Sequence, residues 1–394
     1  METKRVLSSS GSIDSISPLP DELLSHILSF LPTKRAASTS ILSKRWRTLF
    51  PLMNHLCASL YLDVTDLLYP ERQTEEEYYV VHNSFRNFVD KTLSGCNNNS
   101  LKKFSLTYED DDVQRMCLTT GMMSKALEQG VSDLELCIYM PLMYEPPRLL
   151  PDTVFINNTL VKLTLGTELC LGRSPWENVD LPLLKSLFLH TVWFSNHAIC
   201  DVMMDGCPQL EELYIHHNYI EDRDEEFNIH TAPHYIAHNI KKLTVCYNND
   251  VQAPRVLSIY TPNLVYLDYS DYLTCLYNSE NHFNDLLEAR LDLAFARAGR
   301  WGDEHDTCLK IMNSITNVQI LHLSCFTVEV IYECLDLAEI PLFKNLATLH
   351  FEEMENLEEM KVSTSDEIEN KLQLTNDLLA LLPKRSSKCN IHVL

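Results

Sequence analysis

The sequence predicts an α/β protein in which a small all-helical module is followed by a solenoid of parallel strands, a horseshoe with helical or irregular return segments. Two observations predict this fold class. A hexad of the form L-x-x-L-x-L, where L is any apolar residue, occurs nine times after residue 100, at intervals of 24 to 30 residues with one gap of 54. Ahead of the hexads, residues 19–50 hold three short runs with apolar residues at helical spacing.

The chain is expected to have four parts. Residues 1–14 are Ser-rich and lack periodicity, which predicts a disordered tail. Residues 15–60 form the helical module. Residues 61–100 form a helical linker that caps the open end of the solenoid, because apolar side chains recur there at helical spacing. Residues 101–394 hold the repeats.

Charge is distributed unevenly over the 394 residues. The net charge is −23, but residues 1–60 carry seven Lys or Arg and four Asp or Glu, so the remainder has a net charge of −26. An acidic body repels phosphate backbones, and we therefore expect no nucleic acid partner. The N-terminus lacks the apolar core of a signal peptide, and no run of about 18 apolar residues occurs, so no membrane contact is expected.

Cysteine and glycine usage narrows the class of function further. The thirteen cysteines are scattered singly, without a C-x-x-C pair, which is typical of reduced thiols in the nucleus or cytoplasm. With only nine glycines, the sequence has no G-x-G-x-x-G and no phosphate-binding loop, and neither G-x-S-x-G nor H-E-x-x-H occurs. We expect no cofactor, no metal and no catalytic residue, so the chain is not expected to be an enzyme.

The helical module is too small for its apolar content. Its first helix starts at Pro20 and Asp21, since proline has no amide to lose in the first turn and aspartate can accept bonds from free backbone donors. That helix ends at Pro32, a second short run follows, and a third helix capped by Ser43 ends before Pro51. Chains below roughly 40 residues rarely bury this much Leu, Ile and Trp alone. We therefore expect the module to present an apolar surface to another protein.

Three motifs of this module carry a resemblance. They are LPDELL at residues 19–24, HILSFLPTK at 26–34 and TSILSKRWR at 39–47. In these residues the sequence resembles the F-box family, and specifically the plant F-box proteins with leucine-rich repeats. The resemblance implies docking to a Skp-type adaptor and, through it, to the cullin and RING subunits of an SCF ubiquitin ligase. The adaptor face that it implies consists of Leu19, Pro20, Leu23, Ile27, Leu28, Leu31, Leu42 and Trp46.

Nine hexads make up the repeat region. They begin at Leu101, Val131, Leu160, Leu184, Leu210, Ile240, Leu264, Val318 and Leu346. The gap of 54 divides into 22 and 32 if Leu286, Ala289 and Leu291 form a degenerate copy. This period matches leucine-rich repeats, with one strand and one return segment per unit. Phrases such as LPLLKSLFL and TPNLVYLDY also resemble the plant F-box repeats, whereas the C-terminus departs from that family and leaves open how the last repeat is covered.

One return segment can be interpreted in full. Between the fourth and fifth hexads, Ser195 or Asn196 can cap a helix, Gly206 fits a left-handed position at its end, and Pro208 prevents continuation. The apolar face of this helix is Ala198, Ile199, Val202 and Met203. This repeat is therefore expected to run strand, helix, turn, strand.

Alternation along each strand predicts which side chains face the concave side of the solenoid. The first, fourth and sixth residues of a hexad point into the core, so the third and fifth stand on the concave side. Aromatic residues gather there in the middle of the array, and exposed aromatics anchor interfaces. The candidate substrate-binding residues are Phe188, Tyr214, Tyr266, Asp268, His322 and His350. The alternative is that these rings only pack against neighbouring strands.

A zinc site is a rival interpretation of one histidine-rich stretch. His230, His234 and His238 recur every four residues, a spacing that would align three imidazoles on a helix. Pro233 interrupts that run, and no matching acid is fixed nearby. We therefore favour loop histidines without a metal.

Two further patterns also have plainer interpretations. Cys207 could join His216 and His217 at a metal, but it lies in a turn between repeats. The acidic runs at residues 109–112 and 221–226 could bind a basic substrate, although such runs are typical of solvated loops.

The leading hypothesis is a non-catalytic substrate-recognition subunit of an SCF-type E3 ubiquitin ligase, whose repeats hold an unknown target protein near the ligase. Two alternatives stay open. A small-ligand co-receptor of the hormone type would need a basic cluster on the concave face, whereas Lys103, Lys162 and Lys242 lie apart with acids between them. A scaffold that binds the adaptor without ligase output is not distinguished by sequence.

Overall fold

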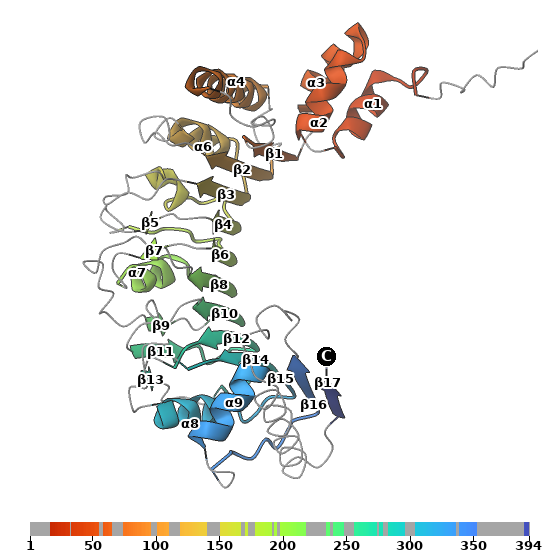
Figure 1. Ribbon diagram of the computed structural model, residues 1–394. Coiled ribbons are helices and arrows are strands. Elements are labelled where there is room, and N and C mark those ends of the chain that lie inside the picture. The colour runs from red at the N-terminus through yellow and green to blue at the C-terminus, as the bar shows by residue number, and fades with distance from the viewer. Residues whose placement is uncertain are drawn as a thin grey trace, which may run out of the picture.

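The chain folds into a curved stack of parallel strands with a helical module at its N-terminal end (Figure 1). No helix among the described residues has both the length and the apolar character needed to cross a membrane. The computed structural model describes residues 16–31, 33–54, 58–64, 74–95, 101–109, 119–139, 150–166, 170–171, 178–190, 193–194, 198–217, 234–236, 239–247, 256–273, 276–278, 283–295, 304–335, 339–352 and 390–393. The tail expected at residues 1–14 and the stop expected at Pro32 lie outside these ranges.

The N-terminal module contains helices α1 (Asp21–Leu28), α2 (Thr33–Ser38) and α3 (Lys44–Asn54), with the 3-10 turn η1 (Thr39–Ile41) between the last two. Pro20 precedes α1 in an extended conformation, as a residue just outside a helix should. The module has a small apolar core of its own. Its buried members are Leu24, Leu28, Ala36, Leu49 and Met53.

Pro51 lies inside α3, whereas the sequence placed the end of this helix before it. A proline in a helix interior removes one backbone hydrogen bond and costs about 3 kcal/mol. The extra turn carries Met53, which is 1% exposed in the module core. Burying a methionine side chain contributes about 1.5–3 kcal/mol, which offsets much of the cost and lets the helix continue.

Arg45 ties α3 to the start of α1. Its guanidinium pairs with the Asp21 carboxylate at 2.7 Å and donates to the backbone carbonyls of Ser17 and Leu19. The planar guanidinium can serve several acceptors at once, which a lysine cannot do. The first and third sequence motifs therefore occur together because their residues meet in space.

Within the described residues, twelve strands form the main sheet, and every neighbouring pair is parallel. The order in the sheet follows the chain, so each repeat adds one strand beside the previous one (Figure 1). This arrangement confirms the predicted α/β solenoid. The strands are β1 (Ser59–Asp63), β2 (Lys103–Glu109), β3 (Asp133–Tyr139), β4 (Lys162–Gly166), β6 (Ser186–His190), β8 (Glu212–His217), β10 (Lys242–Tyr247), β12 (Tyr266–Asp271), β14 (Glu288–Leu293), β15 (Ile320–Ser324), β16 (Thr348–Glu352) and β17 (Asn390–Val393).

The hexads supply the core of the solenoid. Leu160, Leu163 and Leu165, at the first, fourth and sixth positions of one hexad, are fully buried, and the same positions are buried in each of the other eight. The degenerate copy is also confirmed, because β14 contains Ala289 and Leu291 in buried positions. Each buried Leu or Ile contributes about 1.5–3 kcal/mol, so stacking the repeats stabilises what no single repeat could hold.

Return segments form the outer layer of the arc (Figure 1). The helical ones are α4 (Glu75–Ser94), α6 (Thr119–Glu128), η3 (Asp152–Val154), α7 (Ala198–Gly206), α8 (Glu304–Ser314) and α9 (Cys325–Cys334). The extended ones are β5 (Cys170–Leu171) with β7 (Trp193–Phe194), and β9 (His234–Ile236), β11 (Val256–Tyr260) and β13 (Leu276–Asn278), which pair as two small parallel sheets. The outer strands were not expected from sequence. The segment VLSIY in β11 contains β-branched residues, which favour extension, but it does not alternate apolar with polar residues as the strands of the main sheet do.

Helix α7 confirms the predicted return helix but corrects the role of Gly206. Met203 is buried as expected, while Ser195 and Asn196, the proposed caps, lie outside the described residues. Gly206 is the last residue of α7 and does not have a positive φ. A Cβ atom there would lie 2.4 Å from the Val179 carbonyl oxygen. Glycine is therefore required by close packing rather than by a left-handed turn.

The sheet begins at Ser59, earlier than the expected start of the repeats at residue 101. Strand β1 pairs with β2, and its inward residues Leu60 and Leu62 are buried. Helix α4, capped by the Thr74 hydroxyl, which accepts a bond from the Glu77 amide at 3.2 Å, connects these two strands. It is the return helix of a first repeat and not a separate cap. The hexad CASLYL from residue 57 was missed because cysteine occupies its first position.

The helical module packs against this first repeat. The Tyr61 amide of β1 donates to the Thr33 hydroxyl of α2 at 3.0 Å. The Phe50 ring of α3 stacks on Phe88 of α4, with ring centroids 5.9 Å apart. At the other end, β17 pairs with β16, so one further strand covers the last hexad.

Candidate protein-binding surfaces

The N-terminal module leaves a second set of apolar side chains in solvent. Their exposure is large, reaching 75% for Phe30 and 83% for Ile41. These two residues were not among the predicted adaptor contacts. The set, which we call the apolar face, is Leu23, Ile27, Phe30, Leu31, Ile41 and Leu42.

Leu28 does not belong to the apolar face, which corrects one predicted contact. It is 1% exposed and lies in the module core with Leu24. Residues four apart share one side of a helix, so Leu24 and Leu28 point to the core while Leu23 and Ile27 point away from it. The sequence pattern contains both pairs, and only the position of α3 decides which pair is covered.

The remaining predicted contacts are intermediate cases. Leu19 and Trp46 are half-buried and pack against the module core, so each presents only part of its surface. Pro20 is exposed at the start of α1. These three residues lie beside the apolar face rather than forming its centre.

Register along the sheet aligns the concave side chains into rows. The third-position row runs through Lys162, Ser186, Glu212, Lys242, Tyr266 and Glu288. The fifth-position row runs through Thr164, Phe188, Tyr214, Thr244, Asp268, Arg290, His322 and His350. These are the positions that the hexads predicted, so the candidate residues share one face.

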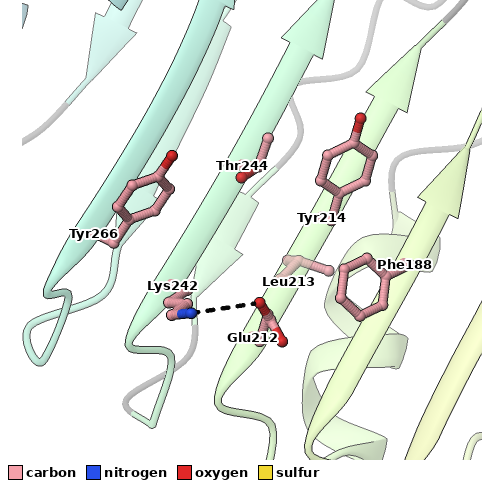
Figure 2. Close-up of a pocket in the computed structure, with 7 residues that line it drawn as sticks. All are labelled: Phe188, Glu212, Leu213, Tyr214, Lys242, Thr244 and Tyr266. Atoms are coloured by element: carbon pink, nitrogen blue, oxygen red, sulfur yellow. Dashed lines mark ion pairs between the residues drawn. The ribbon is translucent and has the colours of Figure 1, made fainter. Parts of the chain in front are cut away.

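A pocket opens in the middle of these rows, with a volume of about 270 Å³. It is lined by Phe188, Glu212, Leu213, Tyr214, Lys242, Thr244 and Tyr266, and we call it the concave pocket (Figure 2). Figure 2 shows Phe188 and Tyr214 on one side, Tyr266 on the other, and the small Thr244 between them. Three of the six predicted substrate-binding residues therefore lie together.

The rings of the pocket contact one another and also remain accessible. Phe188 and Tyr214, on adjacent strands, stack with centroids 5.9 Å apart, and His190 lies 4.7 Å from Tyr214. The Lys162 ammonium sits over the Phe188 ring, 4.6 Å from its centroid. The aromatic rings thus pack against neighbouring strands, which was the alternative to substrate binding, and they also line the open concave pocket.

Polar groups at the rim are fixed by short contacts. The Glu212 carboxylate accepts a bond from the Ser186 hydroxyl at 3.1 Å and lies 3.9 Å from the Lys242 ammonium (Figure 2). Burial raises the pKa of Tyr214, and burial together with Asp268 raises the pKa of Tyr266 to about 12. Both phenols are therefore neutral hydrogen-bond donors at physiological pH.

Asp268, His322 and His350 do not line this pocket. Asp268 lies next to it, and its carboxylate accepts a bond from the Tyr266 hydroxyl at 3.4 Å. His322 is two strands beyond Tyr266, only 8% exposed, and 3.2 Å from the Glu288 carboxylate. It stacks on His350 with centroids 4.3 Å apart. These histidines form a separate pair that is packed more tightly than a recognition surface requires.

The fold does not support the rival sequence patterns, namely the two possible metal sites and the acidic runs. His234 lies in strand β9, so the helical spacing that would align it with His230 and His238 does not apply, and those two residues lie outside the described ranges. Cys207 is buried at the end of α7, whereas His216 stands on the concave side. No cluster of three or more metal-ligating side chains is found in the parts of the chain that the structure describes. Of the acidic runs, only Glu109 at the end of β2 is described.

Comparisons with known proteins match both parts of the chain. Residues 16–56 match the F-box domain family, and residues 120–270 match the repeats described as "FBD-associated F-box protein At5g56370, LRR repeats". The Arabidopsis thaliana F-box protein At5g40050 is 76% identical, with all of both chains covered. The F-box/LRR-repeat proteins At5g25860 and At3g60040 of the same plant are 40% and 39% identical, over 90% and 86% of this chain and 77% and 73% of theirs.

A helical module with an exposed apolar face, joined to a leucine-rich-repeat arc with its own lined pocket, defines a two-surface adaptor. The relatives are similar over both parts. The chain belongs to the plant F-box/LRR-repeat family. This membership supports a substrate-adaptor role, since F-box domains generally bind Skp-type adaptors.

Proposed function

We propose that this protein is the substrate-recognition subunit of an SCF-type E3 ubiquitin ligase. The apolar face docks a Skp-type adaptor and, through it, the cullin and RING subunits. The concave side of the repeats binds a target protein for ubiquitination. The protein acts in the nucleus, the cytoplasm or both.

The apolar face is the observation that carries this proposal. Six large apolar side chains stand in solvent within 20 residues, although the same module buries five others in its core. Large exposed apolar patches are rare on proteins that act alone and mark interaction sites. Adding a partner subunit would remove these side chains from water, at about 25 cal/mol per Å² of apolar surface.

Catalysis in such a complex is a matter of proximity. A target held on the arc is brought near the subunit that transfers ubiquitin, which raises its effective concentration without chemistry in this chain. The contacts between the module and the first repeat support this role, because they hold the two binding surfaces at a defined separation.

The small-ligand alternative finds less support on the concave side. Lys103 is engaged by Asp133 at 3.5 Å and Glu135 at 3.0 Å, and Lys242 lies beside Glu212. These cations are separated and neutralised, whereas a phosphate-rich ligand would require several of them converging on one point.

Co-purification with the adaptor tests the proposal. We expect a Skp-type adaptor to co-purify with the full chain and to be lost, by tenfold or more, with the double substitution Ile41→Asp and Leu42→Asp. Val80→Asp is the matched control, because Val80 is 64% exposed on α4 and far from the apolar face in sequence. Equal recovery of the adaptor with all three proteins would refute the docking surface.

The ligase step needs a second measurement. Proteins that bind the repeats should accumulate when the cullin is inactivated, and they should carry fewer ubiquitin chains. If they bind and neither their abundance nor their modification changes, the protein is an adaptor-binding scaffold without ligase output.

A further inference from the structure

The concave pocket has a defined shape that limits what can enter it. Tyr214 and Tyr266 belong to β8 and β12, which are separated by β10. Parallel neighbours are about 4.8 Å apart, so these two strands lie about 10 Å apart. Thr244, the small side chain on β10, leaves the space between the rings open (Figure 2). The opening therefore admits a single side chain rather than a helix or a strand.

We propose that the concave pocket binds a basic side chain, arginine or lysine, from an extended basic segment of the target protein. This inference deepens the function proposed above, because it gives the chemistry of the segment that the repeats select.

The concave side carries a small excess of negative charge. Along the third- and fifth-position rows from β2 to β15, five carboxylates face four cations. The carboxylates are Asp133, Glu135, Glu212, Asp268 and Glu288, and the cations are Lys103, Lys162, Lys242 and Arg290. The body of the chain after residue 60 has a net charge of −26. Such a field attracts basic partners and repels acidic ones.

Local potentials point the same way. Asp268 and Glu288 both raise the pKa of Tyr266 after burial, and Arg290 opposes them only in part. On balance, the charged groups near the Tyr266 hydroxyl thus disfavour a negative charge on its oxygen. A guanidinium or ammonium placed there would be stabilised by the same carboxylates.

The walls of the pocket suit a cation as well. The face of an aromatic ring carries partial negative charge and attracts Lys or Arg within about 6 Å. This protein already uses that contact, since Lys162 lies 4.6 Å from the Phe188 centroid and Lys103 lies 5.4 Å from that of Tyr61. Tyr214 and Tyr266 offer further ring surface to a cation from a partner.

Other occupants fit less well. An acidic side chain would meet Glu212 and the ring faces. Lys242, the one cation among the lining residues, already lies 3.9 Å from Glu212, and the Lys162 ammonium beside the pocket is placed over the Phe188 ring. A purely apolar side chain would cover the Glu212 carboxylate without giving it a hydrogen bond, which costs free energy.

Labelled peptides test the chemistry directly. The probe is a fluorescein-labelled nine-residue Gly/Ser peptide with three arginines, and its matched versions carry lysine, glutamine, glutamate or leucine at the same positions. Binding to the full chain, purified with its adaptor, is measured by fluorescence anisotropy. We expect the arginine and lysine peptides to bind and the glutamine, glutamate and leucine peptides to bind at least tenfold more weakly.

Paired substitutions separate the pocket from general electrostatics. Glu212→Gln should weaken arginine-peptide binding and Lys242→Gln should strengthen it, each by roughly threefold. Their controls are Glu211→Gln and Lys241→Gln, which change the net charge equally. These two residues directly precede the same strands and form an ion pair of their own at 3.0 Å. We expect these controls to change binding by less than half as much.

Substitutions of the Tyr214 ring test the contribution of the aromatic wall. Tyr214→Leu should weaken binding about 3- to 10-fold, whereas Tyr214→Phe keeps the ring and should retain most of it. Tighter binding of the glutamate or leucine peptide would overturn the inference. So would equal effects of the pocket and control substitutions, because binding would then reflect net charge alone. Adaptor recovery is measured on the same samples. If the parent protein retains the adaptor but does not bind the arginine peptide, only this inference is contradicted. If it binds the peptide but not the adaptor, only the ligase proposal is contradicted.

Discussion

At the scale of single residues, neighbouring positions in the N-terminal module have opposite roles. Leu24 and Leu28 are buried against α3, while Leu23 and Ile27 stand in solvent on the other side of α1. A one-position change along a helix rotates a side chain by about 100°, which is enough to move it from core to surface. The apolar side chains of α1 are thus divided between the module core and the proposed docking surface.

Alanine substitutions should separate these two roles. We expect Leu28→Ala to lower the free energy of unfolding of the module by about 2–5 kcal/mol, because it leaves a cavity in a small core. Leu42→Ala should change that free energy by less than about 0.5 kcal/mol and should weaken adaptor binding instead. Hydrogen exchange of the α1 and α3 amides measures the first effect, and co-purification the second. The assignment is wrong if Leu42→Ala proves the more destabilising of the two.

Thiol chemistry gives a second test at this scale. None of the described cysteines forms a disulfide, and burial raises the pKa of both Cys207 and Cys308 to about 12. At pH 8 both thiols should stay protonated and react with iodoacetamide far more slowly in the folded protein than in urea, where an unperturbed thiol has a pKa near ~8.5. The half-buried Cys325 is the internal comparison. Mass spectrometry of the alkylated peptides should show Cys325 modified first, and early modification of Cys308 would contradict its burial.

At the scale of elements, the return segments decide how closely the outer layer approaches the sheet. Gly206 ends α7 where the chain at Val179 passes so close that a side chain has no room. Gly121 lies within α6, where nothing stands within 4 Å of the position its Cβ would take. The two glycines look alike in sequence, but only one is required by packing.

The same substitution at these two positions should have opposite effects. Gly206→Ala should destabilise the protein by about 1–3 kcal/mol, because backbone atoms of a neighbouring segment would have to move. Gly121→Ala should stabilise it by about 0.5–1 kcal/mol, since alanine favours the helix and meets no obstacle. Urea denaturation of the two variants beside the parent protein gives both values. Equal shifts in the same direction would show that α7 does not pack against Val179 as described.

At the scale of the whole molecule, the proposed function depends on the separation between the apolar face and the concave pocket. The stacked rings of Phe50 and Phe88 and the bond from Tyr61 to Thr33 join the module to the first repeat. An aromatic pair of this kind contributes about 0.5–1.5 kcal/mol beyond its buried area. Without it, the module would remain folded on its own core but would no longer be held at a fixed angle.

Loosening this junction should change geometry more than stability. We expect Phe88→Ala to broaden the distribution of distances between spin labels at Ser38 and Lys344, as measured by pulsed electron paramagnetic resonance. We also expect it to slow ubiquitination of a bound target. Val80→Ala, on the exposed side of the same helix, should do neither. An unchanged distribution in Phe88→Ala would mean that other contacts fix the angle.

Much of this architecture follows from sequence. The hexads correctly predicted three buried positions in each of nine repeats, because alternation and a fixed repeat length leave few ways to bury nine sets of apolar side chains. The hexad pattern did not predict the first repeat, because a cysteine replaces its leading leucine. Only the pairing of β1 with β2 identifies this repeat. Likewise, the outer strands β9, β11 and β13 depend on one another for their hydrogen bonds. No local sequence pattern therefore predicts them.

By itself, the sequence determined the order of the parts, the inward face of each hexad and the rows to which the concave aromatics belong. These features follow from the spacing of residues along the sequence. Only the tertiary structure decided that Leu28 is core, that Gly206 is required by Val179, and that Phe188, Tyr214 and Tyr266 share a pocket which His322 and His350 do not enter. Those outcomes depend on which segments lie beside one another, because burial and close contact are set by neighbours distant in the chain.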